Sequence, residues 1–84
     1  MNIDRWRGRS ALITGASSGI GAAIARALST QLGMRVAVMA RRPERLETLA
    51  RECRSQGADI LSCPGDVTSL PDVHAAFDQI RAAW

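Results

Sequence analysis

The chain has 84 residues, enough for one small domain with a single hydrophobic core. Its net charge is +3, and all of its basic residues are arginines because the sequence contains no lysine. Acidic and basic residues alternate on the most charged segment and no aromatic stacking set accompanies them, so the composition argues against a nucleic-acid-binding surface.

Membrane attachment is also not indicated by the sequence. Hydrophobic residues make up 46% of the chain, but no apolar run is long enough to cross a bilayer. The first seven residues lack the apolar core of a signal peptide. We therefore expect a cytoplasmic protein without a membrane partner.

Three short apolar runs predict three strands. They cover residues 10–14, 35–40 and 60–63, and their apolar residues do not alternate strictly with polar ones. Such runs are typical of strands that are covered on both faces of a parallel sheet. Pro64 and Gly65 mark the end of the third run.

Three helical patterns follow the three runs. The first begins at about Ser18 or Gly19 and continues to Leu32, with Ile20, Ile24 and Leu28 on one face. The second begins at Pro43 and ends at Gly57, and the third begins near Ser69 and continues to Trp84.

This alternation predicts an α/β fold, half of a doubly wound parallel Rossmann sheet with the order β-α-β-α-β-α. Right-handed crossovers give the strand order 3-2-1 and place the first two helices on one face of the sheet. The third helix then covers part of the other face. The first strand is left as an open edge, through which we expect self-association.

Between the first run and the first helix lies a glycine-rich segment, residues 14–21. In a strand-loop-helix setting, such glycines allow a sharp turn, a close approach of backbone to ligand and tight packing of the helix. Free N–H groups and the helix dipole at the helix start favour an anion such as a pyrophosphate. The alternative is that the glycines serve only the turn. The candidate cofactor-binding residues here are Gly15, Ser17, Ser18, Gly19, Ile20 and Gly21.

The spacing Gly-x-x-x-Gly-x-Gly after Thr14 resembles the cofactor loop of the short-chain dehydrogenase/reductase family, and the resemblance extends from about Arg9 to Trp84. It implies a dinucleotide cofactor and an oxidoreductase that moves hydride between the cofactor and a carbonyl or alcohol group. The chain would then be the N-terminal part of a single NADP-binding domain, residues 1–84, without the catalytic half.

The end of the second predicted strand indicates which cofactor is bound. In dinucleotide-binding folds this end lies near the adenosine ribose, where an acidic residue accepts from a free 2′-hydroxyl. Here Arg41 and Arg42 follow Ala40, and guanidinium groups bind phosphate. The sequence therefore favours NADP (NADPH) over NAD, and the resemblance implies that Arg41 holds the 2′-phosphate with Arg42 as a helper. The alternative is that both arginines are simply solvated.

Asp66 and Val67 follow the third predicted strand. The resemblance implies that this pair lines the adenine pocket, where an aspartate accepts from the exocyclic amine. In the alternative interpretation, Asp66 only closes the turn that begins at Pro64.

The catalytic residues implied by the resemblance are missing. The family uses a Tyr-x-x-x-Lys pair with a serine and an asparagine, and this chain contains neither tyrosine nor lysine. We therefore predict no catalytic residue and no metal site in this chain, and no turnover by the chain alone. The other hypothesis is a non-catalytic nucleotide-binding or protein-interaction module. A P-loop is excluded because no Lys-Ser or Lys-Thr follows the glycines.

Overall fold

The sheet has three parallel strands. In the computed structural model, which describes residues 5–16 and 19–84, these are β1 (Ser10–Thr14), β2 (Arg35–Ala40) and β3 (Ile60–Pro64). β2 lies between the other two, so the order β1-β2-β3 is the predicted order 3-2-1 counted from the opposite edge. In the parallel register Leu12 pairs with Ala37, and Val38 pairs with Ser62.

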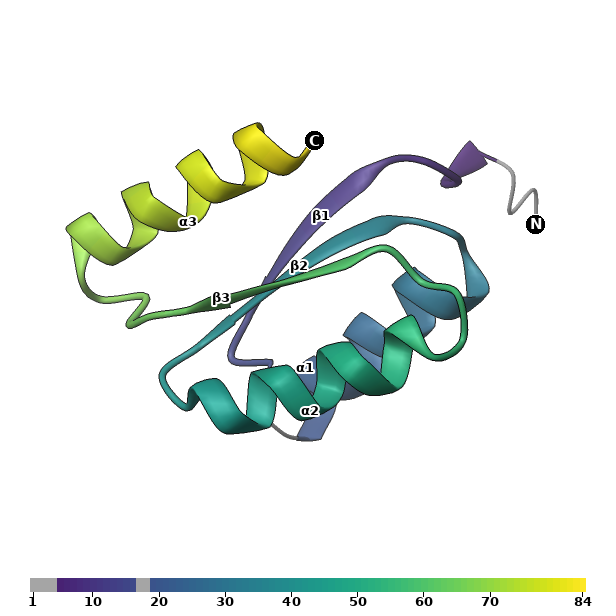
Figure 1. Ribbon diagram of the computed structural model, residues 1–84, viewed down its shortest axis with the longest axis horizontal. Helices are drawn as coiled ribbons and strands as arrows, with labels where there is room; N and C mark the ends of the chain where they lie inside the picture. The colour runs from purple at the N-terminus through teal and green to yellow at the C-terminus, as the bar shows by residue number, and fades with distance from the viewer. Residues whose placement is uncertain (1–4, 17–18) are drawn as a thin grey trace.

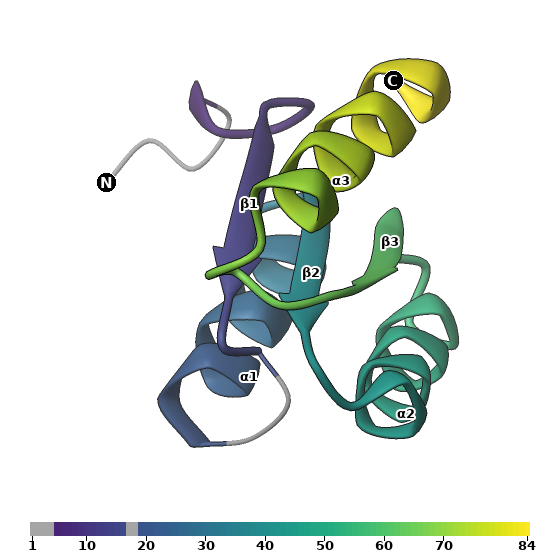
Figure 2. The ribbon, with the colours of Figure 1, turned by 90° about the vertical axis from the view of Figure 1, so that its left-hand side faces the viewer.

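The helices cover the two faces unequally. α1 (Gly19–Arg26), its continuation η2 (Ala27–Gln31) and α2 (Pro43–Arg54) lie on one face, and α3 (Leu70–Ala83) lies on the other (Figures 1 and 2). This is the arrangement that right-handed crossovers predict. In the described ranges, no helix has the length and apolar character needed to span a membrane.

Side chains of β2 alternate between two hydrophobic clusters. Val36 and Val38 pack with buried residues of α1 and α2, whereas Ala37 and Met39 pack with Cys63 and α3. The four β2 side chains are at most 1% exposed. β2 is therefore buried on both faces, as its uninterrupted apolar sequence predicts.

The buried residues of α1 are small alanines and not the isoleucines of the helical pattern. Ile20 is 80% exposed and Ile24 is 43% exposed, whereas Ala22 and Ala25 are buried. Of the residues that form the predicted helical pattern, Leu28 and Leu32 pack against the core, whereas Ile20 and Ile24 do not. Small side chains on the buried face let the helix axis approach the sheet closely, an alternative that hydrophobic periodicity alone does not reveal.

The last turn of the first helix is π-helical instead of regular. The Leu32 N–H donates to the Ala27 carbonyl oxygen at 3.3 Å, and the hydroxyl groups of Ser29 and Thr30 donate to carbonyl oxygens of the preceding turn. Serine and threonine compete in this way with the regular helix pattern. Gly33 follows with φ +68°, a conformation that favours glycine, and ends the helix.

Candidate nucleotide-binding site

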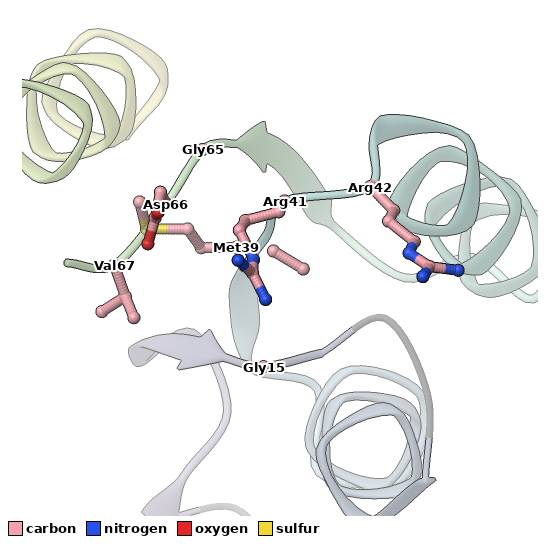
Figure 3. Close-up of a pocket in the computed structure, with 8 residues that line it drawn as sticks. Gly15, Met39, Arg41, Arg42, Gly65, Asp66 and Val67 are labelled. Carbon is pink, nitrogen blue, oxygen red and sulfur yellow. The ribbon is translucent and has the colours of Figure 1, made fainter. Parts of the chain in front are cut away.

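A pocket of about 610 Å³ lies where the three strands reach their carboxyl ends (Figure 3). This is the edge at which open α/β sheets bind their ligands. It is lined by Gly15, Met39, Ala40, Arg41, Arg42, Gly65, Asp66 and Val67. The fold therefore brings together five of the ten residues predicted to bind the cofactor, from three separate segments of the chain.

The loop after β1 turns from strand toward helix at Gly15, which has φ +65°. The Ala16 N–H donates to the Met39 carbonyl oxygen at 3.4 Å, which holds the loop against the end of β2. A Cβ at Gly21 would lie 2.5 Å from the Gly15 carbonyl oxygen, too close for any side chain. The third glycine of the motif thus permits α1 to pack against the loop.

Gly19, Ile20 and Gly21 do not line this pocket. Gly19 lines a second hollow between α1 and α2, and the Ile20 side chain projects outward. Ser17 and Ser18, which were also predicted to reach the phosphates, lie outside the described residues. Among the described glycines of the motif, Gly15 therefore lines the pocket, whereas Gly19 and Gly21 do not.

The end of β2 supplies two exposed arginines. Figure 3 shows the Arg41 guanidinium directed into the pocket toward Gly15, whereas the Arg42 side chain extends away along the start of α2. In residues 5–16 and 19–84, neither guanidinium takes part in an ion pair. Arg42 is also the residue before the first turn of α2 and makes no capping bond with its side chain. Arg41 is thus the arginine placed to meet an anion inside the pocket.

The end of β3 is held by hydrogen bonds. The Thr68 N–H and hydroxyl donate to Asp66 Oδ1 at 2.9 and 2.7 Å. The Asp66 N–H donates to Asp72 Oδ2 at 2.8 Å, and the Ser69 N–H donates to the Asp66 carbonyl oxygen at 2.9 Å. Asp66 does close a turn, as the alternative interpretation held, but it also lines the pocket.

These hydrogen bonds change the acidity of Asp66. The two bonds from Thr68 hold the pKa of the Asp66 carboxyl below its ordinary value of 3.8, and the nearby Arg41 guanidinium lowers the pKa further. Asp66 is consequently a carboxylate at neutral pH. It can accept hydrogen bonds there but cannot donate them.

Met39 and Gly65 line the pocket but were not among the predicted residues, and Asp72 and Thr68 were not recognised as its supports. The Gly65 N–H donates to the Ala40 carbonyl oxygen at 2.9 Å, which joins the ends of β3 and β2. The sequence does carry a weak signal for Thr68 and Asp72, because polar side chains close behind Asp66 can bond its turn. Their actual partners depend on how α3 approaches the sheet.

Comparison with known proteins identifies the family of this chain. Residues 9–84 match the family model for short chain dehydrogenase. The chain belongs to the short-chain dehydrogenase family. It is 44% identical over 82 residues to human dehydrogenase/reductase SDR family member 11, a match that covers 95% of this chain and 31% of that protein. The chain spans about a third of the length of the curated relatives it matches first.

Solved structures of the family have the same fold. L-sorbose reductase from Gluconobacter frateurii, complexed with NADPH and L-sorbose, matches with a TM-score of 0.91 at 33% identity, over 100% of this chain and 32% of that one. Actinorhodin polyketide ketoreductase with NADPH matches with a TM-score of 0.84 at 39% identity, over 92% of this chain and 29% of that one. The three strands and their helices thus form the N-terminal half of a Rossmann-type sheet.

Proposed function

We propose that this chain is the NADP(H)-binding N-terminal part of a short-chain oxidoreductase that would transfer hydride between NADP(H) and a carbonyl or alcohol substrate. The observation that supports the proposal most directly is the Arg41 guanidinium, which points into the pocket and forms no ion pair with any described residue. The Asp66 carboxylate is near enough to interact with Arg41 but forms no ion pair with it, so an anionic ligand would supply a direct partner. Two solved structures matched by the chain contain NADPH.

The residues of the pocket fit this cofactor. Arg41 would hold the 2′-phosphate, and a negative side chain that would repel it is absent from residues 39–42. The Asp66 carboxylate would accept from the exocyclic amine of adenine, beside the apolar Val67 side chain. Gly15, in the loop that leads to α1, would face the pyrophosphate. NAD is the less suited cofactor because the two residues directly after β2 are arginines and not acidic residues.

The nicotinamide of the bound cofactor would supply the hydride, and this chain would bind and orient the adenosine end. Hydride transfer to a carbonyl also needs a proton donor of suitable pKa. The family's tyrosine and lysine are absent from this sequence, so we expect no turnover by this chain alone.

A non-catalytic module is the second candidate function. It is favoured by the edge of β1, which pairs only with β2 among the described strands. An unpaired strand edge can pair with another chain.

We propose self-association through β1. Size-exclusion chromatography over a concentration series tests this proposal, and a monomer at every concentration would contradict it.

A calorimetric titration with adenosine 2′,5′-bisphosphate and with 5′-AMP tests the cofactor. Charge-assisted hydrogen bonds contribute roughly 1.5–3 kcal/mol, so we expect about tenfold to hundredfold tighter binding of the 2′-phosphorylated ligand. Arg41→Asp should abolish this preference. Arg51→Asp, an equal change of charge on α2 outside the pocket, should keep it. Equal affinities for the two ligands in the unaltered chain would refute the NADP assignment.

A further inference from the structure

Asp72 makes a contact that its position in the helix does not explain. It lies in the first turn of α3, where an acidic residue ordinarily favours the helix dipole or bonds back to the capping residue. Here the N–H of the capping residue Ser69 donates instead to the Asp66 carbonyl oxygen. The Asp72 carboxylate reaches past Ser69 and accepts from the Asp66 N–H through Oδ2 at 2.8 Å.

The lack of a side chain at the neighbouring Gly65 leaves room for this contact. A Cβ at position 65 would lie 3.2 Å from Asp72 Cβ and 3.4 Å from Asp72 Oδ2. It would also lie 3.2 Å from Met39 Cε. Because glycine stands there, the Asp72 side chain can pass beside the backbone at the end of β3 and reach the amide of Asp66.

Besides the bond from Ser69 to its carbonyl oxygen, Asp66 is held through its amide and its carboxylate. Asp72 fixes its main-chain N–H, and Thr68 donates both of its hydrogen bonds to Oδ1 of the side chain. The other carboxylate oxygen, Oδ2, accepts no hydrogen bond from any residue of the described ranges. Oδ1 of Asp66 thus stabilises the turn through Thr68, and Oδ2 can accept a hydrogen bond from a ligand.

We propose that Asp72 is a positioning residue for recognition of the nucleotide base. By fixing the Asp66 amide, it orients the Asp66 carboxylate so that Oδ2 meets a hydrogen-bond donor of the base, and so favours a purine with an exocyclic amine over one with an oxo group. Asp72 itself touches no ligand. The inference rests on the proposed function, since it assumes that the adenine end of the cofactor occupies this pocket.

The test compares adenosine 2′,5′-bisphosphate with inosine 2′,5′-bisphosphate by calorimetric titration of the 84-residue chain. A hydrogen bond to a charged group corresponds to about tenfold in affinity, so the unaltered chain should prefer the adenine ligand by about that factor. In Asp72→Ala the preference should fall to less than about threefold. Asp72→Asn keeps an oxygen that can accept from the Asp66 N–H and should retain most of the preference.

Asp78→Ala is the matched control. Asp78 is an exposed aspartate of the same helix whose side chain makes no hydrogen bond or ion pair in the described structure, and its removal should leave the base preference unchanged. Asp72→Ser is a second variant in case Asp72→Ala does not fold, because serine is well accepted near a helix start but its side chain is too short to reach the Asp66 N–H. It should lose the preference as well.

The outcomes separate this inference from the proposed function. The gap between 2′-phosphorylated and plain adenosine monophosphate depends on Arg41, so it should persist in every Asp72 variant. A folded Asp72→Ala or Asp72→Ser chain that keeps the base preference would overturn the positioning role. So would an Asp72→Asn chain that loses it, because charge and not geometry would then matter. An unaltered chain without base preference would overturn the inference but leave the NADP assignment intact if the 2′-phosphate gap is seen.

Discussion

The pocket joins two strand ends that are built in different ways. At the end of β2, Arg41 and Arg42 are exposed and form no ion pair among the described residues. At the end of β3, Asp66 is bonded through its amide, its carbonyl oxygen and its carboxylate. Attraction between an arginine and a phosphate tolerates some movement of a long side chain, whereas a hydrogen bond to a base edge depends on direction. The end of β3, which is proposed to bind the base edge, is therefore the side of the pocket that the fold holds in place by hydrogen bonds.

The strongest test of this contrast separates the two arginines. Arg41 points into the pocket and Arg42 points away, so Arg41→Ala should weaken binding of adenosine 2′,5′-bisphosphate by about tenfold to hundredfold. Arg42→Ala should weaken it by less than about threefold, because an exposed charge without direct contact is screened by salt. Calorimetric titration at two salt concentrations measures both effects.

Binding of 5′-AMP is the internal control for this pair. It should change little in either variant, because 5′-AMP lacks the phosphate that Arg41 is proposed to hold. Equal losses of affinity for adenosine 2′,5′-bisphosphate in the two variants would mean that the arginines act only through their summed charge. The different directions of the Arg41 and Arg42 side chains would then not matter for binding.

The next test concerns the ordered end of β3. A Cβ at Gly65 would be 3.2 Å from both Met39 Cε and Asp72 Cβ, so Gly65→Ala should crowd the pocket wall and lower the free energy of unfolding by about 1–2 kcal/mol. Urea unfolding followed by circular dichroism measures this change. In a Met39→Val background, which removes the sulfur and the terminal methyl group, the cost of Gly65→Ala should be smaller. Strictly additive effects of the two substitutions would show that Met39 does not limit the space at position 65.

Much of the fold was predictable from the sequence, because the strands are apolar runs and the helices have clear starts and stops. The bounds of β2 agree with the predicted range 35–40, and Ser69 caps α3 as its residue type indicates. The helical spacing did not reveal which residues of α1 are buried. Its core contacts come from Ala22 and Ala25, while periodicity favoured the larger Ile20 and Ile24.

The candidate site was predictable in part, because the position of a residue after a predicted strand indicates where it lies in the sheet. Arg41 directly follows β2 and Asp66 is the second residue after β3, and the ends of neighbouring parallel strands meet at one edge of the sheet. Met39 and Gly65 lie at the same strand ends but were not among the predicted residues, and Asp72 could not be assigned in this way. The role of Asp72 depends on the approach of α3 to the end of β3, a tertiary relation that no local sequence pattern specifies.

The smallest expected effect tests how Thr68 supports Asp66. Thr68→Val removes the hydroxyl donor but keeps the N–H, so the pKa of the Asp66 carboxyl should rise part of the way toward 3.8. NMR titration of the carboxyl carbon measures this shift. Thr48→Val is the matched control, because the Thr48 hydroxyl donates to the Glu44 carbonyl oxygen on α2, away from the pocket, and should leave the pKa of Asp66 unchanged.

The same variant predicts a pH dependence of stability. The folded-state pKa of Asp66 lies below its ordinary value of 3.8, so its ionised form stabilises the fold above about that pH, and this contribution is lost as the pH falls through the folded-state pKa. With a pKa closer to 3.8, Thr68→Val has less of this contribution to lose. Its stability deficit relative to the unaltered chain should therefore be larger at neutral pH than below the folded-state pKa of Asp66. A deficit that is the same at both would mean that Thr68 supports the turn through packing, without favouring the ionised carboxylate that base recognition is proposed to use.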